Sequence, residues 1–278
     1  MLILLAPAPL HGLTVLKHRH KHDREHPMNT TLTALIVFGC LVGAVLTGRA
    51  IRRLLPDQHL SSDSRDGIKL ALGLVSTMSA LVMGLLVSSA KSSYDTERSE
   101  VIQMAAKVAF LDRVLAMYGP EAADARGRFE EGVRDTIKRM WPEEAGLPAR
   151  LAPNTQTGSA MYAAIQNLSP RDEPQRKLKD QAVSLATDLG QLRFLLQAQS
   201  VPSISEPMLI ILVSWLVIIF LGFSVLAPPN ATTILALTVS AVAVSGAIFL
   251  ILELDQPFGG VLRISSEPMM NALHQLEK

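Results

Sequence analysis

The chain has 278 residues, of which 49% are hydrophobic and 18% are charged, and its formal net charge is +1. This balance provides no basic field for nucleic acid, and an aromatic content of 5% leaves few rings to stack on bases. The single cysteine, Cys40, excludes an intramolecular disulfide. Almost all charge lies outside four apolar stretches, so the sequence predicts an integral membrane protein that binds no nucleic acid.

Residues 1–27 differ in character from the rest of the chain. Their apolar run is too short to span a bilayer, and the basic segment follows it, whereas charge precedes the apolar run in a secretory signal. The basic segment contains four histidines that could bind a metal, but their spacing does not suit a closed site. They are His18, His20, His22 and His26. We expect a disordered or non-native extension, with Met28 as an alternative start.

Residues 28–90 are predicted to form a transmembrane hairpin. Its first span covers about 32–51 and contains the pair Gly39 and Gly43, a GxxxG pattern on one helical face. Its second span covers 70–90, which is long enough to cross a bilayer and carries no charge. A cluster of arginines closes the first span, and we expect it to anchor the helix among lipid headgroups. These are Arg49, Arg52 and Arg53.

The second span carries small residues at steps of three and four, which fall on one helical face. They are Gly73, Thr77, Ala80, Gly84 and Ser88. Such a face permits close helix packing or lines a narrow polar path, and both interpretations remain open. We expect it to be turned inward, packed on a similar face of the fourth span or sharing an interior with it. That second face consists of Ala236, Ser240, Ala243 and Ala247.

Residues 91–205 are predicted to form a soluble helical bundle inserted between the second and third spans. No proline or glycine occurs from Lys91 until Gly119, and apolar residues recur at helical spacing. The second span should therefore continue into water as one long helix that ends at Gly119 and Pro120. Further helices are expected over 120–141, 160–168 and 173–199. Their charges fit an ordinary solvated surface.

Residues 206–254 are predicted to form a second transmembrane hairpin, with spans at about 208–227 and 231–252. Residues 255–278 form a tail with a short amphipathic helix. The predicted fold class is therefore all-α: a four-span integral membrane protein with a helical soluble insert.

The end of the fourth span carries two carboxylates, Glu253 and Asp255, at or just inside the membrane interface. A carboxylate at membrane depth is costly unless it is paired, hydrated or protonated. One interpretation is an ion pathway or subunit contact; the other is a helix end whose carboxylates reach water. The following Pro257, Gly259 and Gly260 should force the chain to turn.

The sequence contains no catalytic or cofactor motif. There is no Walker loop, dinucleotide fingerprint, HExxH, CxxC or serine elbow. His59 and His274 lie beside no plausible nucleophile. We expect neither an enzyme nor a bound cofactor or metal. Basic residues near the membrane are balanced between the two sides, and only those of the N-terminal extension favour a cytoplasmic bundle with both termini on that side.

Three stretches within residues 28–278 resemble the bacterial bestrophin-like family. They are RRLLPDQHLSSDSRDGIKLALGLVSTMSALVMGLLVSSAKSSYDTERSEV, MAAKVAFLDRVLAMYGPEA and LELDQPFGGVLRISSEPMMNAL. The order of two spans, a helical insert, two spans and a tail is also similar to that of true bestrophins, pentameric anion channels with a pore lined by the second span and with cytoplasmic termini.

The segment from Pro257 through Phe258 to Gly259 is similar to the PFG that follows the last bestrophin span. Animal bestrophins continue with an acidic run that helps bind calcium, whereas Gly260 and Val261 follow here. The bestrophin neck is ringed by bulky apolar and aromatic residues, whereas span 70–90 contains no aromatic residue. The resemblance therefore does not imply calcium gating.

Two functional hypotheses follow. The first is a homo-oligomeric channel for small anions in the bacterial inner membrane, lined by the small-residue face of the second span. The second is a non-conducting membrane scaffold whose bundle binds a protein partner.

Overall fold

The computed structural model describes residues 29–54, 62–142, 149–199, 204–228 and 230–277. The N-terminal extension, with the candidate ligands His18, His20, His22 and His26, lies outside these residues. Within them the chain is helical and contains no strand.

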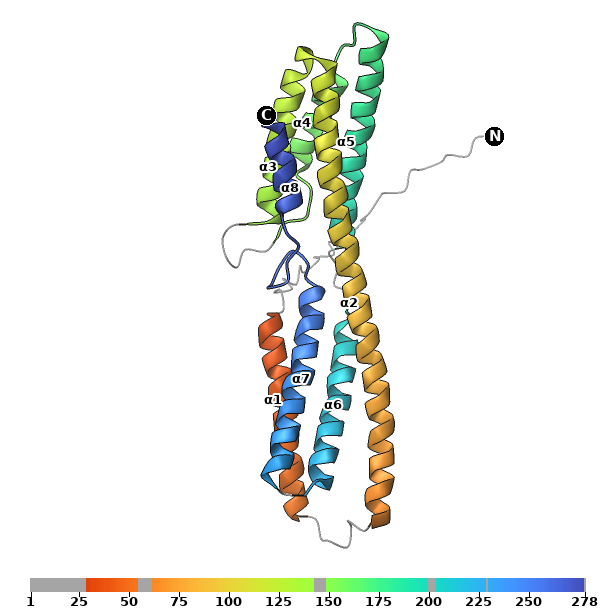
Figure 1. The fold of residues 1–278 in the computed structure, drawn as a ribbon, viewed down its shortest axis with the longest axis vertical. Helices are drawn as coiled ribbons and strands as arrows, with labels where there is room; N and C mark the ends of the chain where they lie inside the picture. Colours follow the sequence, from red (N-terminus) through yellow and green to blue (C-terminus); the bar gives the residue numbers. More distant parts are fainter. Residues whose placement is uncertain (1–28, 55–61, 143–148, 200–203, 229, 278) are drawn as a thin grey trace, which may run out of the picture.

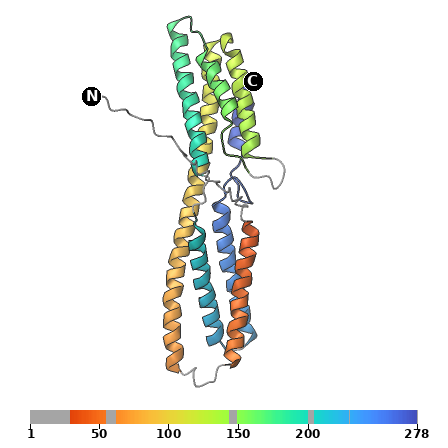
Figure 2. The same ribbon diagram turned by 180° about the vertical axis from the view of Figure 1, so that it is seen from behind.

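Four long apolar helices lie side by side in one half of the molecule (Figure 1). Each is long and apolar enough to cross a membrane, which confirms the predicted fold class. Figure 2 shows the same arrangement from behind. The helices are α1 (Thr30–Leu54), α2 (Ser62–Tyr118), α6 (Glu206–Leu226) and α7 (Ala231–Leu254).

Helix α2 is 57 residues long and runs from the membrane half through the other half of the molecule (Figure 1). This confirms the prediction of one uninterrupted helix. It ends where predicted, because Gly119 adopts a φ of 119°, a conformation that other residues rarely adopt, and Pro120 begins the next turn.

The other half of the molecule is a bundle that packs four more helices against the end of α2. The 3-10 turn η2 (Pro120–Ala122) precedes α3 (Ala123–Met140), which is followed by α4 (Thr155–Gln166) and α5 (Glu173–Gln199). The C-terminal helix α8 (Glu267–Leu276) completes the bundle. Their apolar faces enclose one core, in which Leu111 of α2, Phe129 of α3 and Ile165 of α4 are buried.

Helix α4 begins five residues earlier than the sequence indicated. The side-chain oxygen of Asn154 accepts hydrogen bonds from the backbone N–H groups of Gln156 (3.2 Å) and Thr157 (3.4 Å). This N-cap satisfies two donors that a helix start leaves free, so the helix extends back to Thr155.

The four membrane helices enclose a second apolar core around Leu41, Leu86, Leu212 and Ile248. Helices α1 and α6 approach closely at Gly48, where an added Cβ would lie 2.7 Å from the backbone oxygen of Leu221. Beside it, the Ser224 hydroxyl donates to the Val45 carbonyl oxygen at 2.6 Å.

The predicted GxxxG pair makes no close contact within the chain. Added Cβ atoms at Gly39 and Gly43 would meet no heavy atom within 4 Å. The GxxxG pattern alone therefore did not identify the glycine that brings α1 close to another helix.

Candidate functional site

The membrane half of α2 has a buried side and an exposed side. Leu72, Ser79, Leu86 and Ala90 are buried, and their spacing of seven and four places them on one face toward the other membrane helices. Leu72 also packs against α6, where an added Cβ on Gly222 would lie 2.6 Å from Leu72 Cδ1.

The small-residue face lies on the exposed side, so the expectation that it packs inside the chain is wrong. At Gly73 and Gly84 an added Cβ would meet no heavy atom within 4 Å. The other helices of the chain are contacted instead by a neighbouring face of α2, with Leu86 buried and Val82 and Val87 partly buried in the membrane core. All five small residues are exposed: Gly73, Thr77, Ala80, Gly84 and Ser88.

The small residues of the fourth span do not meet those of the second. Ala236, Ser240 and Ala243 are exposed and Ala247 is half-buried. Helix α7 instead buries a neighbouring face that includes Ile248. The two helices pack together, but through other faces than those expected.

The exposed face of α2 continues beyond the span as an open polar groove. Along it, Lys91 Nζ pairs with Asp95 Oδ1 at 2.5 Å and lies 5.5 Å from the centre of the Tyr94 ring. From Gly73 to Gln103, one side of a single helix thus presents small or polar residues. The groove is lined by Ser88, Lys91, Ser92, Asp95, Thr96, Ser99, Glu100 and Gln103.

At the end of α7, Glu253 is 1% exposed and does not reach water. The Thr30 hydroxyl, at the start of α1, donates to Oε1 of Glu253. The backbone N–H groups of Val261 and Leu262 donate to Oε2 at 2.6 and 3.3 Å. The carboxylate therefore joins the first span, the last span and the segment after it.

Gly260 makes this contact possible. It has a φ of 64°, and an added Cβ would lie 2.9 Å from Cδ of Glu253. Any side chain here would be strained and would also displace the carboxylate. Asp255, by contrast, is half-buried and forms the C-cap of α7.

The segment after α7 also connects the membrane half to the bundle. Phe258 is buried against Trp141, which follows α3, with ring centres 6.0 Å apart and planes at 63°. The Trp141 indole N–H donates to the Ile264 carbonyl at 2.8 Å, and the Ile264 N–H donates to the Pro257 carbonyl at 2.7 Å. The chain turns here, as Pro257, Gly259 and Gly260 predicted.

Two buried glutamates lie on α2 between the membrane half and the bundle. Glu97 is 5% exposed and Glu100 is 7% exposed. Gln199 Nε2 of α5 donates to Glu100 Oε1 at 3.0 Å, while Oε2 of each glutamate has no hydrogen-bond partner among the described residues. Burial, followed by the charges of Glu100 and Asp255, raises the pKa of Glu97 to about 7.

These glutamates were not predicted to be buried, because the balanced charges of the bundle fit an ordinary solvated surface. A signal was present in the sequence: Glu97 precedes the apolar Val101 by four residues and Met104 by seven, which places it on the apolar face of the helix. Chemically, Glu97 can bind and release a proton near neutral pH.

The arginines at the end of α1 lie at the end of the membrane half that is farthest from the bundle, beside the connection between α6 and α7. Arg49 and Arg52 are half-buried and border this connection, while Arg53 is exposed. Their role as a headgroup anchor remains a prediction. Across the described residues, no group of three or more histidine, cysteine, aspartate or glutamate side chains could hold a metal ion.

These features define an all-α membrane protein with four spans and a helical bundle built around one long helix. The bestrophin-like domain model matches residues 36–269, so the chain belongs to the bestrophin-like family. This confirms the resemblance found in the sequence. No curated protein sequence matches it significantly.

The fold is also that of a bacterial bestrophin homologue from Klebsiella pneumoniae. Two crystal structures of point variants of that protein match with TM-scores of 0.66 and 0.65 and sequence identities of 13% and 14%. The matches cover 88% and 89% of this chain and 97% of the other chain in both cases.

Proposed function

We propose that this protein is a homo-oligomeric channel for small anions, with the small-residue face of α2 lining the conduction path. The observation that carries the proposal is the exposure of this face in the single chain. It meets no other helix of its own chain around Gly73 and Gly84. A face with glycine and hydroxyl groups gains little from contact with lipid, whereas it lets water and ions pass close to the backbone.

The charges along α2 do not oppose anion passage. Residues 70–90 contain no acidic side chain that would attract cations. A lysine lies at each end of this stretch, Lys69 and Lys91. Each pairs with an aspartate of the same helix, so neither end is strongly charged. Membership of the bestrophin-like family gives independent support.

The test is ion flux through purified protein in planar bilayers or liposomes. Gly84→Trp should reduce an anion-selective current because a bulky ring would enter the path. The matched control is Leu85→Trp, on the next residue of the same helix, whose side chain is exposed on a different face. Blocking by Leu85→Trp with normal current in Gly84→Trp would show that the path is wrongly assigned.

The oligomeric state distinguishes the channel from the scaffold hypothesis. Native mass spectrometry of protein in nanodiscs should show a closed homo-oligomer, because one chain cannot enclose a path with a single exposed face. A monomer would exclude this pore design. A stable oligomer without current in any lipid, and with Gly84→Trp harmless, would favour a non-conducting scaffold.

The proposal includes an inner-membrane location with the bundle and both termini in the cytoplasm. A reporter fused after Lys278 tests this orientation. Activity of a reporter that functions only outside the cytoplasm would reverse it.

A further inference from the structure

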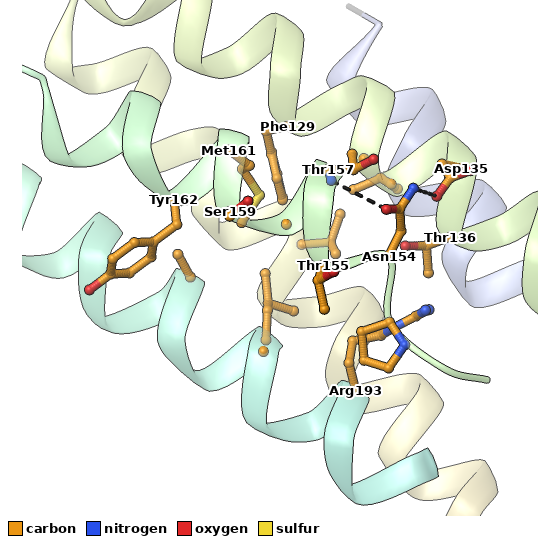
Figure 3. A pocket seen from close by; sticks show the side chains of 18 of the residues that line it. Phe129, Asp135, Thr136, Asn154, Thr155, Thr157, Ser159, Met161, Tyr162 and Arg193 are labelled. Carbon is orange, nitrogen blue, oxygen red and sulfur yellow. Dashed lines mark hydrogen bonds between the residues drawn. The ribbon is translucent and has the colours of Figure 1, made fainter.

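The bundle contains a cavity of about 450 Å³ between α2, α3, α4 and α5 (Figure 3). This volume lies within the range of roughly 300–1,000 Å³ typical of small-molecule sites. Most of its wall is apolar, as in such sites. The apolar wall includes Met104, Val108, Phe129, Val133, Met161 and Leu189.

Polar side chains gather at one end of this cavity. Figure 3 places Asp135, Thr136 and Asn154 together there, with Arg193 of α5 nearby. Asn154 Nδ2 donates to Asp135 Oδ2 at 3.3 Å, while its oxygen caps α4. The hydrogen-bonding groups of Asn154 are thus engaged within the protein, whereas those of Arg193 are not fully used.

Arg193 is half-buried, and its Nη1 contacts the Met140 sulfur at 3.0 Å. Asp135, the carboxylate at this end of the cavity, forms its ion pair with Arg139 instead, at 3.9 Å. Burial and the charge of Arg139 lower the pKa of Arg193 to about 10, despite the opposing effect of Asp135. The guanidinium is therefore charged at neutral pH but incompletely compensated, and its planar donors match a carboxylate.

We propose that this cavity binds a small organic monocarboxylate, with its apolar body against Phe129, Met161 and Leu189 and its carboxylate on Arg193. Asp135 disfavours a second negative charge at this end. The site therefore discriminates against phosphate monoesters, which carry more charge than a carboxylate. The proposal concerns binding in the bundle and does not depend on ion conduction.

The test is equilibrium dialysis of 2-naphthoate against the full chain in nanodiscs, with empty nanodiscs as the reference. Saturable binding of one probe per chain is expected. The uncharged 2-naphthamide should bind about tenfold more weakly, since it loses the charge-assisted pair. Arg193→Gln should abolish this preference. Arg113→Gln, which removes an exposed arginine of α2 outside the cavity, should preserve it.

A pair of variants at Gly190 tests the location independently of Arg193. Gly190 lines the cavity, and an added Cβ there would meet no heavy atom within 4 Å. Gly190→Phe should occupy the space and abolish binding, whereas Gly190→Ala should bind as wild type. Either substitution favours the helix over glycine, so folding should be retained.

Four results would overturn the proposal: no saturable binding, equal binding of 2-naphthamide, tighter binding of 2-naphthyl phosphate, or unchanged binding in Gly190→Phe.

Discussion

Removal of the Glu253 carboxylate should destabilise the whole chain. Glu253→Ala leaves the Thr30 hydroxyl and the Val261 N–H without their charged acceptor. A hydrogen bond to a charged group contributes about 1.5–3 kcal/mol. The Leu262 contact is longer, at 3.3 Å, and water can replace part of the loop bonding because both loop residues are exposed. We therefore expect a total loss of about 3 kcal/mol.

This loss corresponds to a decrease in melting temperature of roughly 6–12 °C, on the scaling for domains of 150–250 residues. Glu253→Gln should lose about half as much, since an amide retains one acceptor oxygen and can donate to Thr30. Thermal unfolding in detergent measures both values. In a Trp215→Phe background, fluorescence of Trp141 reports on the same segment, because its ring contacts Phe258.

Gly260→Ala provides an independent route, because its Cβ would displace the intact carboxylate. It should lower the melting temperature as well. The control is Glu131→Ala, which removes an exposed carboxylate of α3 and should change stability by less than about 0.5 kcal/mol. The reasoning fails if Glu253→Ala melts within a degree of wild type, or if the control loses as much.

Two further predictions concern pH and helix packing. The pKa of Glu97 is raised to about 7 in the folded chain, from 4.5 in the unfolded chain. Between these two pH values Glu97 is therefore protonated in the folded chain and ionised in the unfolded chain. The free energy of unfolding should therefore fall as pH rises from about 4.5 to 7. Glu97→Gln should remove most of this pH dependence. An equally steep profile of melting temperature against pH in the variant would contradict the prediction. Gly48→Ala should destabilise by about 1–3 kcal/mol because its Cβ would meet the Leu221 backbone oxygen at 2.7 Å. Gly39→Ala in the same helix should be neutral or stabilising by up to about 1 kcal/mol; similar melting temperatures for the two variants would refute this account.

The helices were predictable because their signals are local. The absence of proline and glycine beyond Lys91 was enough to extend α2 into the bundle, and Gly119 was enough to end it. The start of α4 was misplaced because the capping role of Asn154 was not recognised.

The site was less predictable because it depends on contacts between distant residues. Glu253 and Thr30 are 223 positions apart, so the sequence could not show that the carboxylate would meet a hydroxyl rather than water. The sequence showed that small residues share one face of α2 around Gly84. It did not show that this face is exposed in the single chain. A helical pattern separates faces without saying which neighbour each one meets. The cavity around Arg193 was not predicted, because residues of five helices, α2, α3, α4, α5 and α8, line it.

Because α2 is one continuous helix, it connects the bilayer rigidly to the bundle. At 1.5 Å per residue, its 57 residues form a rod of about 85 Å. A tilt of about 5° at one end would displace the other by about 7 Å over that length. Transmembrane helices adjust their tilt to the thickness of the surrounding lipid. A change in membrane thickness would therefore move the bundle sideways directly, through α2 alone.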